Sequence, residues 1–221
     1  PRRAHLLVST VLGKHIPTDP AQVRRGADLL GDLVLDALGT KDVAVLGFAE
    51  TATGLGHGVA ARMQAHWYLH STRRAGAPEF SSFEEGHSHA TNHLLQPFSP
   101  DLFDGDHPLV LVDDEYSTGR TVVDAIRSLH RIAPREHYVM AALVDMRTDE
   151  HQAEVEAAMA ELGEVATQAD GANMDAGIVA ALSLNRPAEW AAVEVDELHV
   201  PHVSDAVDPE VPVILNTGAR A

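Results

Sequence analysis

The stretch from Leu109 to Thr121 reads Leu-Val-Leu-Val-Asp-Asp-Glu-Tyr-Ser-Thr-Gly-Arg-Thr, and it indicates a strand, a polar turn and the start of a helix. Four apolar β-forming residues come first, two carboxylates follow, and small hydroxyl-bearing residues with one glycine precede an amphipathic segment. A short apolar run next to a helix is typical of a buried parallel strand. This stretch therefore predicts one strand–turn–helix unit of an α/β sheet.

The same alternation of strands and helices continues on both sides of this unit. Helical spacing of apolar residues predicts helices over about 21–38, 54–64, 119–132 and 151–162, and short apolar runs predict strands over about 43–48, 67–71, 108–113, 137–145 and 192–195. Such an order predicts an α/β fold with a doubly wound, mainly parallel sheet. Residues 74–107 show little apolar period, and a connection of this length is usually a functional lid or disordered.

We expect a single domain over residues 1–221, with a core of about 21–163 and a small hood made of about 1–20 and 164–221. The first residue is Pro1 and not Met, so we expect a trimmed or excised chain, with more protein at either end.

Composition narrows the classes of partner. The chain has 221 residues, 33 acidic and 16 basic side chains, and a formal net charge of −17. Binding to a nucleic-acid backbone or an anionic membrane surface needs clustered Lys and Arg, so neither partner is expected. No window approaches the length of about 18 apolar residues that a membrane helix needs. The absence of cysteine suits a reducing compartment, and we expect a cytoplasmic protein.

The polar part of the opening stretch carries the chemistry. Hydroxyls of Ser117, Thr118 and Thr121, together with backbone N–H groups at a helix start, form a cradle for an anion. Asp113 and Asp114 end a strand at the edge where α/β sheets bind ligands, and their oxygens suit two vicinal hydroxyls. A phosphate and a diol together indicate a ribose 5-phosphate.

This pattern resembles the phosphoribosyl-diphosphate motif of the type I phosphoribosyltransferase family: four apolar residues, two acids, three variable positions and Thr-Gly-x-Thr. Two positions differ from much of the family. Glu115 replaces an apolar residue, and Ser117 replaces the acid that purine-salvage members place near the base. These differences argue against purine salvage.

Other segments extend the resemblance over about residues 5–145. Residues 47–53 follow the first core strand, where the family binds pyrophosphate through backbone amides, and Arg73-Arg74 follow the second strand, as a basic residue does in the orotate branch. Residues 83–93 match the family's mobile loop and contain His87, His89 and His93. The alternative for these histidines is a zinc site. Taken together, the motifs look like the branch encoded with bacterial tellurite-resistance-type gene clusters, whose enzymes often have a further C-terminal domain.

The resemblance implies transfer of ribose 5-phosphate from phosphoribosyl diphosphate to a nucleobase-like acceptor, with Mg²⁺ as cofactor and a homodimer as the expected assembly. The metal is held mainly by the substrate, with Asp113 and Asp114 in its outer shell. The implied catalytic residues are Asp113, Asp114, Arg73 and His89; the ribose and 5-phosphate site is Asp113, Asp114, Glu115, Tyr116, Ser117, Thr118, Gly119, Arg120 and Thr121; the pyrophosphate site is Ala49, Glu50, Thr51, Arg73 and Arg74. The alternative is a non-catalytic module of the same fold that senses nucleotides or phosphoribosyl diphosphate. Lys14 and His15 are candidates for the hood that recognises the acceptor, or belong to a surface loop.

Overall fold

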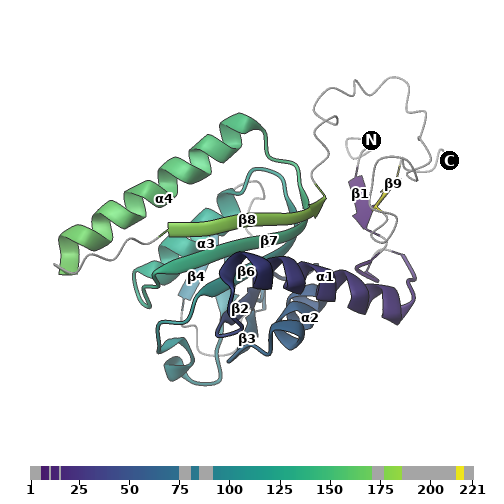
Figure 1. The fold of residues 1–221 in the computed structure, drawn as a ribbon, viewed down its shortest axis with the longest axis horizontal. Coiled ribbons are helices and arrows are strands. Elements are labelled where there is room, and N and C mark those ends of the chain that lie inside the picture. The colour runs from purple at the N-terminus through teal and green to yellow at the C-terminus, as the bar shows by residue number, and fades with distance from the viewer. Residues whose placement is uncertain are drawn as a thin grey trace.

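The computed structural model describes residues 6–9, 11–14, 16–74, 81–84, 92–170, 177–185 and 213–216. A five-stranded parallel sheet lies at its centre, in the order β3-β2-β6-β7-β8 (Figure 1). The strands span Ala44–Gly47 (β2), Tyr68–His70 (β3), Leu109–Tyr116 (β6), His137–Asp145 (β7) and Gly177–Asn185 (β8). The mainly parallel α/β sheet predicted from the sequence is confirmed.

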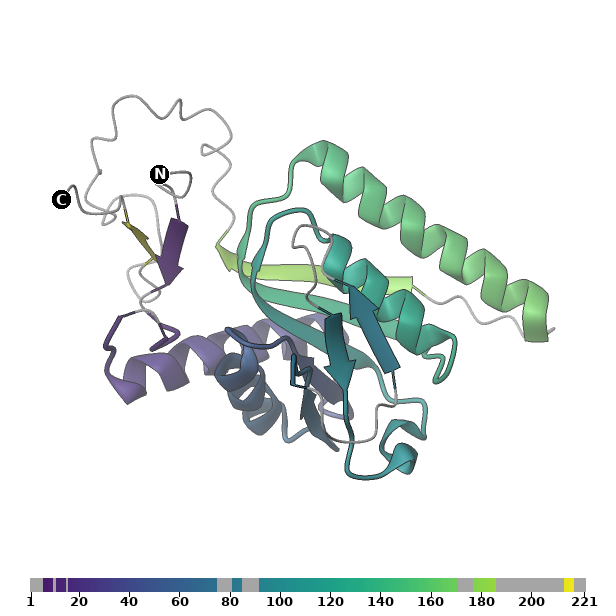
Figure 2. The same ribbon diagram turned by 180° about the vertical axis from the view of Figure 1, so that it is seen from behind.

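Helices cover both faces of this sheet. Figure 1 shows α1 (Pro20–Leu38) and α2 (Thr53–Met63) on one face, and α3 (Arg120–His130) and α4 (Asp149–Asp170) on the other. Figure 2, the view from behind Figure 1, turns the face that carries α3 toward the reader. Alternate residues of β6 divide between two cores: Leu109 and Leu111 pack on the α3 and α4 side, and Val110 and Val112 on the α1 and α2 side. Burial on both faces explains why the sequence of β6 is continuously apolar.

Helix α1 shows how local sequence sets the element boundaries. The Asp19 carboxylate accepts a hydrogen bond from the N–H of Ala21 at 2.8 Å, and Pro20 occupies the first turn, where its missing N–H costs nothing. At the other end Gly39 has a φ of 66° and donates its N–H to the carbonyl of Leu35. A left-handed residue at this position favours glycine, so the helix ends where the sequence predicts.

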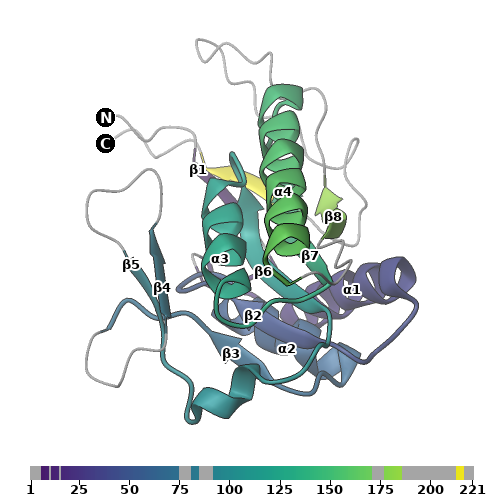
Figure 3. The same cartoon turned by 90° about the vertical axis from the view of Figure 1, so that its left-hand side faces the viewer.

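The connection over residues 74–107 contains structure that the sequence did not predict. Strands β4 (Ser81–Glu84) and β5 (Asn92–Leu95) form an antiparallel hairpin, and the short 3₁₀ helix η1 spans Pro100–Phe103. Figure 3 shows the hairpin standing beside α3. The Ser128 hydroxyl of α3 donates to the carbonyl of Ser82 at 3.1 Å, and Thr72 and Leu94 form a β-bridge. The hairpin is therefore fastened both to α3 and to the end of β3.

Two further differences concern the end of the chain. Strand β8 pairs with β7, although it lies within the segment expected to form the hood. The expected strand at 192–195 lies outside the described residues. Strand β1 (Leu6–Ser9) pairs antiparallel with β9 (Val213–Asn216), in a separate two-stranded sheet. Among the helices described, none combines the length and apolar character needed to cross a membrane.

Candidate active site

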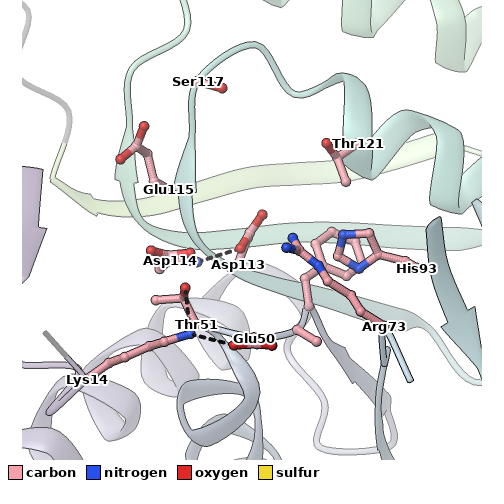
Figure 4. Close-up of a pocket in the computed structure, with 12 residues that line it drawn as sticks. Lys14, Glu50, Thr51, Arg73, His93, Asp113, Asp114, Glu115, Ser117 and Thr121 are labelled. Carbon is pink, nitrogen blue, oxygen red and sulfur yellow. Dashed lines mark hydrogen bonds and ion pairs between the residues drawn. The ribbon is translucent and has the colours of Figure 1, made fainter. Parts of the chain in front are cut away.

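A cavity of about 300 Å³ opens at the carboxyl ends of β2 and β6 (Figure 4). Along the chain the five core strands occupy the sheet in the order second, first, third, fourth, fifth, so the connections leaving β2 and β6 run in opposite directions. Ligands of doubly wound sheets bind at such a switch point. The lining residues are Lys14, Phe48, Ala49, Glu50, Thr51, Arg73, His93, Asp113, Asp114, Glu115, Ser117 and Thr121.

Three consecutive acidic residues form one side of the cavity. β6 continues beyond the predicted end at Asp113, because Glu115 and Tyr116 still pair with β7. Asp113 accepts a hydrogen bond from the N–H of Asp114 at 2.9 Å. Burial, and then the charge of Asp114, raise the pKa of the Asp113 carboxyl well above its ordinary value, and the same two causes raise the pKa of Glu115. A ligand that brings hydrogen-bond donors or positive charge would therefore stabilise the charged form of these carboxylates.

The turn after β6 holds small side chains against the same cavity. Ser117 and Thr121 line it, at the start of α3. Gly119 between them has a φ of 81° and is the N-cap residue of α3. A Cβ at this position would lie 2.9 Å from Cγ2 of Val155 and 3.1 Å from Cδ of Arg147. Both the backbone conformation and the packing therefore require glycine.

A buried ion pair supports this turn from behind. Arg147 donates to both oxygens of Asp145, at 2.9 and 2.7 Å, and its guanidinium lies 5.7 Å from the centre of the Tyr116 ring. The Tyr116 hydroxyl lies 3.1 Å from the carbonyl oxygen of Leu111 and 3.0 Å from that of Ala141, and its single hydrogen is shared between the two acceptors. Tyr116 is 2% exposed, so its side chain fixes the turn and does not face the cavity.

The loop after β2 forms the opposite side of the cavity. The peptide bond between Ala49 and Glu50 is cis. The carboxylate of Glu50 is paired with a cation: Nζ of Lys14 lies 3.6 Å from Oε2 of Glu50 and donates to Oγ1 of Thr51 at 3.3 Å. Lys14 thus contacts the loop after β2. The sequence alone left open whether this residue belongs to the hood or to a surface loop.

A buried hydrogen-bonded chain connects that loop to the hairpin. The N–H of Ala49 donates to Oγ of Ser71 at 2.9 Å, and Oγ of Ser71 lies 2.7 Å from Nδ1 of His93. Both side chains are almost fully buried, at 0% and 2% exposure. Since the hydroxyl oxygen already accepts from Ala49, its hydrogen is available to His93 Nδ1. Sequence patterns alone gave no sign of the role of Ser71.

The two arginines after β3 separate in the structure. The side chain of Arg73 reaches into the cavity toward Asp113 and Asp114 (Figure 4), whereas Arg74 is exposed and does not line it. His87 and the predicted catalytic residue His89 lie outside the described residues. The zinc alternative needs both of them together with His93, so the described residues do not test it. The ring of His93 is buried beside Phe48, with ring centroids 5.9 Å apart.

The remaining predicted residues lie next to the cavity without lining it. Arg120 points to α4, where its guanidinium pairs with Glu154 at 3.2 Å, and Thr118 lines a second cavity, of about 270 Å³, between α3 and α4. Gly119 is buried beneath the turn. The structure thus brings nine of the predicted residues to one cavity: Ala49, Glu50, Thr51, Arg73, Asp113, Asp114, Glu115, Ser117 and Thr121.

The charges around the cavity fit a divalent cation. Four carboxylates line it, against the two basic side chains of Lys14 and Arg73. An anionic ligand would meet net repulsion from this set, and carboxylate oxygens are ligands that suit Mg²⁺. Asp113 and Asp114 are the residues that could hold such an ion through water molecules.

These features define a doubly wound α/β protein with an acidic ligand cavity at its switch point. The chain belongs to the phosphoribosyl transferase family, because its residues 1–172 match the sequence model of the family described as "Phosphoribosyl transferase". A search of curated proteins found no match.

Similar solved structures include three adenine phosphoribosyltransferases. The Trypanosoma brucei protein, in complex with AMP, pyrophosphate and ribose-5-phosphate, is 17% identical, with a TM-score of 0.44 over 65% of this chain and 65% of that chain. The Giardia lamblia protein, complexed with 9-deazaadenine, is 15% identical, with a TM-score of 0.48 over 68% and 86%. The Leishmania donovani protein is 15% identical, with a TM-score of 0.43 over 78% and 72%. The chain thus spans just under two thirds of the Trypanosoma brucei protein.

Proposed function

We propose that this protein is a Mg²⁺-dependent pentosyltransferase that moves the 5-phosphoribosyl group of phosphoribosyl diphosphate to a ring nitrogen of a nucleobase-like acceptor and releases pyrophosphate. The observation that supports it best is the shared cavity: the Asp113–Asp114 pair and the turn with Ser117 and Thr121 face the loop that contains Ala49 and Thr51. One side suits a ribose phosphate and the other suits pyrophosphate, as a phosphoribosyl diphosphate molecule requires.

Each part of the cavity has a role in this reaction. The carboxylates of Asp113 and Asp114 accept hydrogen bonds from the ribose hydroxyls, and the Ser117 and Thr121 hydroxyls with the N-terminus of α3 bind the 5-phosphate. As the bond between C1 and the pyrophosphate oxygen breaks, its electron pair moves to pyrophosphate. Arg73, with the loop after β2 and with His89, stabilises that charge, so catalysis rests on positioning and electrostatics.

The acceptor nitrogen forms the new bond to C1 and then loses its proton to solvent or to a base. Mg²⁺, when bound with the substrate, neutralises pyrophosphate charge and makes it a better leaving group. Lys14 pairs with Glu50 and so lowers the electrostatic repulsion between this loop and a bound anion. We further propose a cytoplasmic homodimer and membership of the branch encoded with tellurite-resistance-type gene clusters, on the sequence motifs alone.

Calorimetric titration with phosphoribosyl diphosphate and Mg²⁺ tests the binding half of the proposal. We expect binding by the unmodified protein and its loss in the Asp113→Asn, Asp114→Asn double variant. Asp36→Asn is the control, because Asp36 is exposed on α1 and lies outside the cavity lining. No binding by the unmodified protein, or unchanged binding by the double variant, would contradict the proposal.

A second experiment tests transfer and identifies the acceptor. Nucleobases and related heterocycles are incubated with the protein and substrate, and mass spectrometry detects the ribosyl 5-phosphate adduct while a coupled assay measures pyrophosphate. An adduct supports the transferase. Tight binding with no pyrophosphate release for any acceptor would instead support the sensing module.

A further inference from the structure

A second polar cluster lies at the opposite edge of the sheet from the cavity. Asp42, His66 and His107 each stand two residues before a strand begins, at the amino ends of β2, β3 and β6. Because parallel strands start at the same edge of a sheet, residues far apart in the sequence meet there. The proposed transferase reaction uses the carboxyl edge, so this cluster has no role in it.

The three side chains converge on one point. Nδ1 of His107 lies 2.9 Å from Oδ1 of Asp42, and Nε2 of His66 contacts the same oxygen. The two imidazole rings are stacked, with centroids 3.9 Å apart and planes inclined by 13°. One ligand atom from each residue lies within 4.8 Å of the other two. Two imidazole nitrogens and a carboxylate oxygen directed at one volume are a common ligand set for a divalent transition metal.

Backbone hydrogen bonds of the sheet hold the three residues in place. The N–H of His66 donates to the carbonyl of Val43 at 2.9 Å, and the N–H of Ala44 donates to the carbonyl of Pro108 at 3.0 Å. The N–H of Asp42 donates to Oγ1 of Thr40 at 3.0 Å. The ligand positions are therefore set by the edge of the sheet before any ion binds, and binding would cost little ordering of the backbone.

A buried arginine fixes the loop that carries His107. Arg135 is 1% exposed, and its guanidinium donates to the carbonyls of Phe103, Gly105 and His107, at 2.7, 2.6 and 3.2 Å. Gly105 adopts a φ of 103°, and a Cβ there would meet the His107 ring at 3.5 Å. These three hydrogen bonds from one buried side chain fix the loop. They thereby hold the imidazole of His107 over that of His66.

We propose that Asp42, His66 and His107 bind one Zn²⁺ ion, or a similar first-row divalent ion, through Oδ1, Nε2 and Nδ1. Both histidines are neutral ligands in this state, and any protons on those nitrogens are released when the ion binds. Asp42 and His66 are exposed, with side-chain exposures of 61% and 50%, so a fourth position is open to water. The ion would join the starts of three core strands.

The test compares metal binding by the unmodified chain, His66→Gln, His107→Gln and the control His137→Gln. His137 begins β7 at the same edge, is exposed and lies outside the cluster. After dialysis against a chelator, Zn²⁺ is titrated against a chelating indicator, and Co²⁺ is added separately for its visible absorption spectrum. We expect one site per chain, a loss of more than about tenfold in affinity for either cluster variant, and no change for the control.

Three readouts separate this site from other histidines and from misfolding. The titration is repeated in a His87→Ala, His89→Ala background, which removes the other histidine pair that the sequence offers. Zn²⁺ should raise the melting temperature of the unmodified chain but not that of the cluster variants. Without metal, the melting temperatures of the cluster variants should match that of the unmodified chain without metal. Absence of a stoichiometric site in this background would overturn the proposal. So would a Zn²⁺ affinity of His66→Gln or His107→Gln equal to that of the unmodified chain.

Discussion

Replacing Gly119 with alanine tests how closely the turn at the cavity depends on packing behind it. The added Cβ would lie 2.9 Å from Cγ2 of Val155 and 3.1 Å from Cδ of Arg147. Arg147 cannot move freely, because it is 8% exposed and makes a bidentate ion pair with Asp145. The alanine must therefore displace either α4 or the turn itself.

Two costs add up in this variant. A non-glycine residue in the left-handed region costs about 1–2 kcal/mol, and forcing extra atoms into a packed region costs about 1–3 kcal/mol. We expect a loss of about 2–5 kcal/mol in the free energy of unfolding. For a domain of this size that corresponds to a fall of roughly 4–20 °C in melting temperature.

Gly39→Ala is the matched control, because Gly39 also has a positive φ, 66°, but a Cβ there would meet no atom within 4 Å. It should lose only the backbone part, about 1–2 kcal/mol. Urea unfolding gives both values, and calorimetry with phosphoribosyl diphosphate and Mg²⁺ should show weaker binding for Gly119→Ala alone. Equal losses of stability in the two variants would refute the packing argument.

Three further substitutions test the surroundings of the cavity. Asp113→Asn should raise the melting temperature at neutral pH, because the folded-state pKa of Asp113 is raised and the wild type loses stability as pH rises above the unfolded pKa of about 3.9, whereas the variant has no carboxyl to ionise there. An equal gain in melting temperature at pH 3.5 and pH 7.5 would contradict this. Asp145→Asn should cost about 3–5 kcal/mol in urea unfolding, since it leaves Arg147 buried without its carboxylate; a loss under 1 kcal/mol would contradict the role of the pair. Ser71→Ala should cost about 1–3 kcal/mol and weaken calorimetric binding of the substrate, because the N–H of Ala49 loses its acceptor; unchanged stability would show that water replaces the hydroxyl.

The sequence was informative about the core sheet because its strands are buried on both faces. Continuous apolar runs such as Val110 to Val112, each followed by a helical period, can be recognised without knowing their partners. The hairpin β4–β5 was missed, since Ser81 and Ser82 are polar and contact α3 through hydroxyl and carbonyl groups. Strand β8 was missed as well, although it joins the same sheet beside β7.

The candidate site was predictable where its residues are close in sequence and not where the fold brings distant ones together. Asp113 to Thr121 form one local motif with a recognisable spacing. The contact of Lys14 with Glu50 spans 36 positions, and that of Ser71 with His93 spans 22. Nor does spacing show which side of a strand end a residue faces, which is why Tyr116 was grouped with its exposed neighbours.

The pairing of β1 with β9 has a consequence for how the chain folds during synthesis. Leu6 pairs with Asn216, so the partners are 210 positions apart and the ribosome makes β9 long after β1. Closing a loop of this length costs about 5 kcal/mol of chain entropy if nothing has folded before. Folding of the central sheet shortens that loop, so β1 remains without its partner while the intervening residues are made. A chaperone that binds apolar segments such as Leu6-Leu7-Val8 would find β1 accessible during that time.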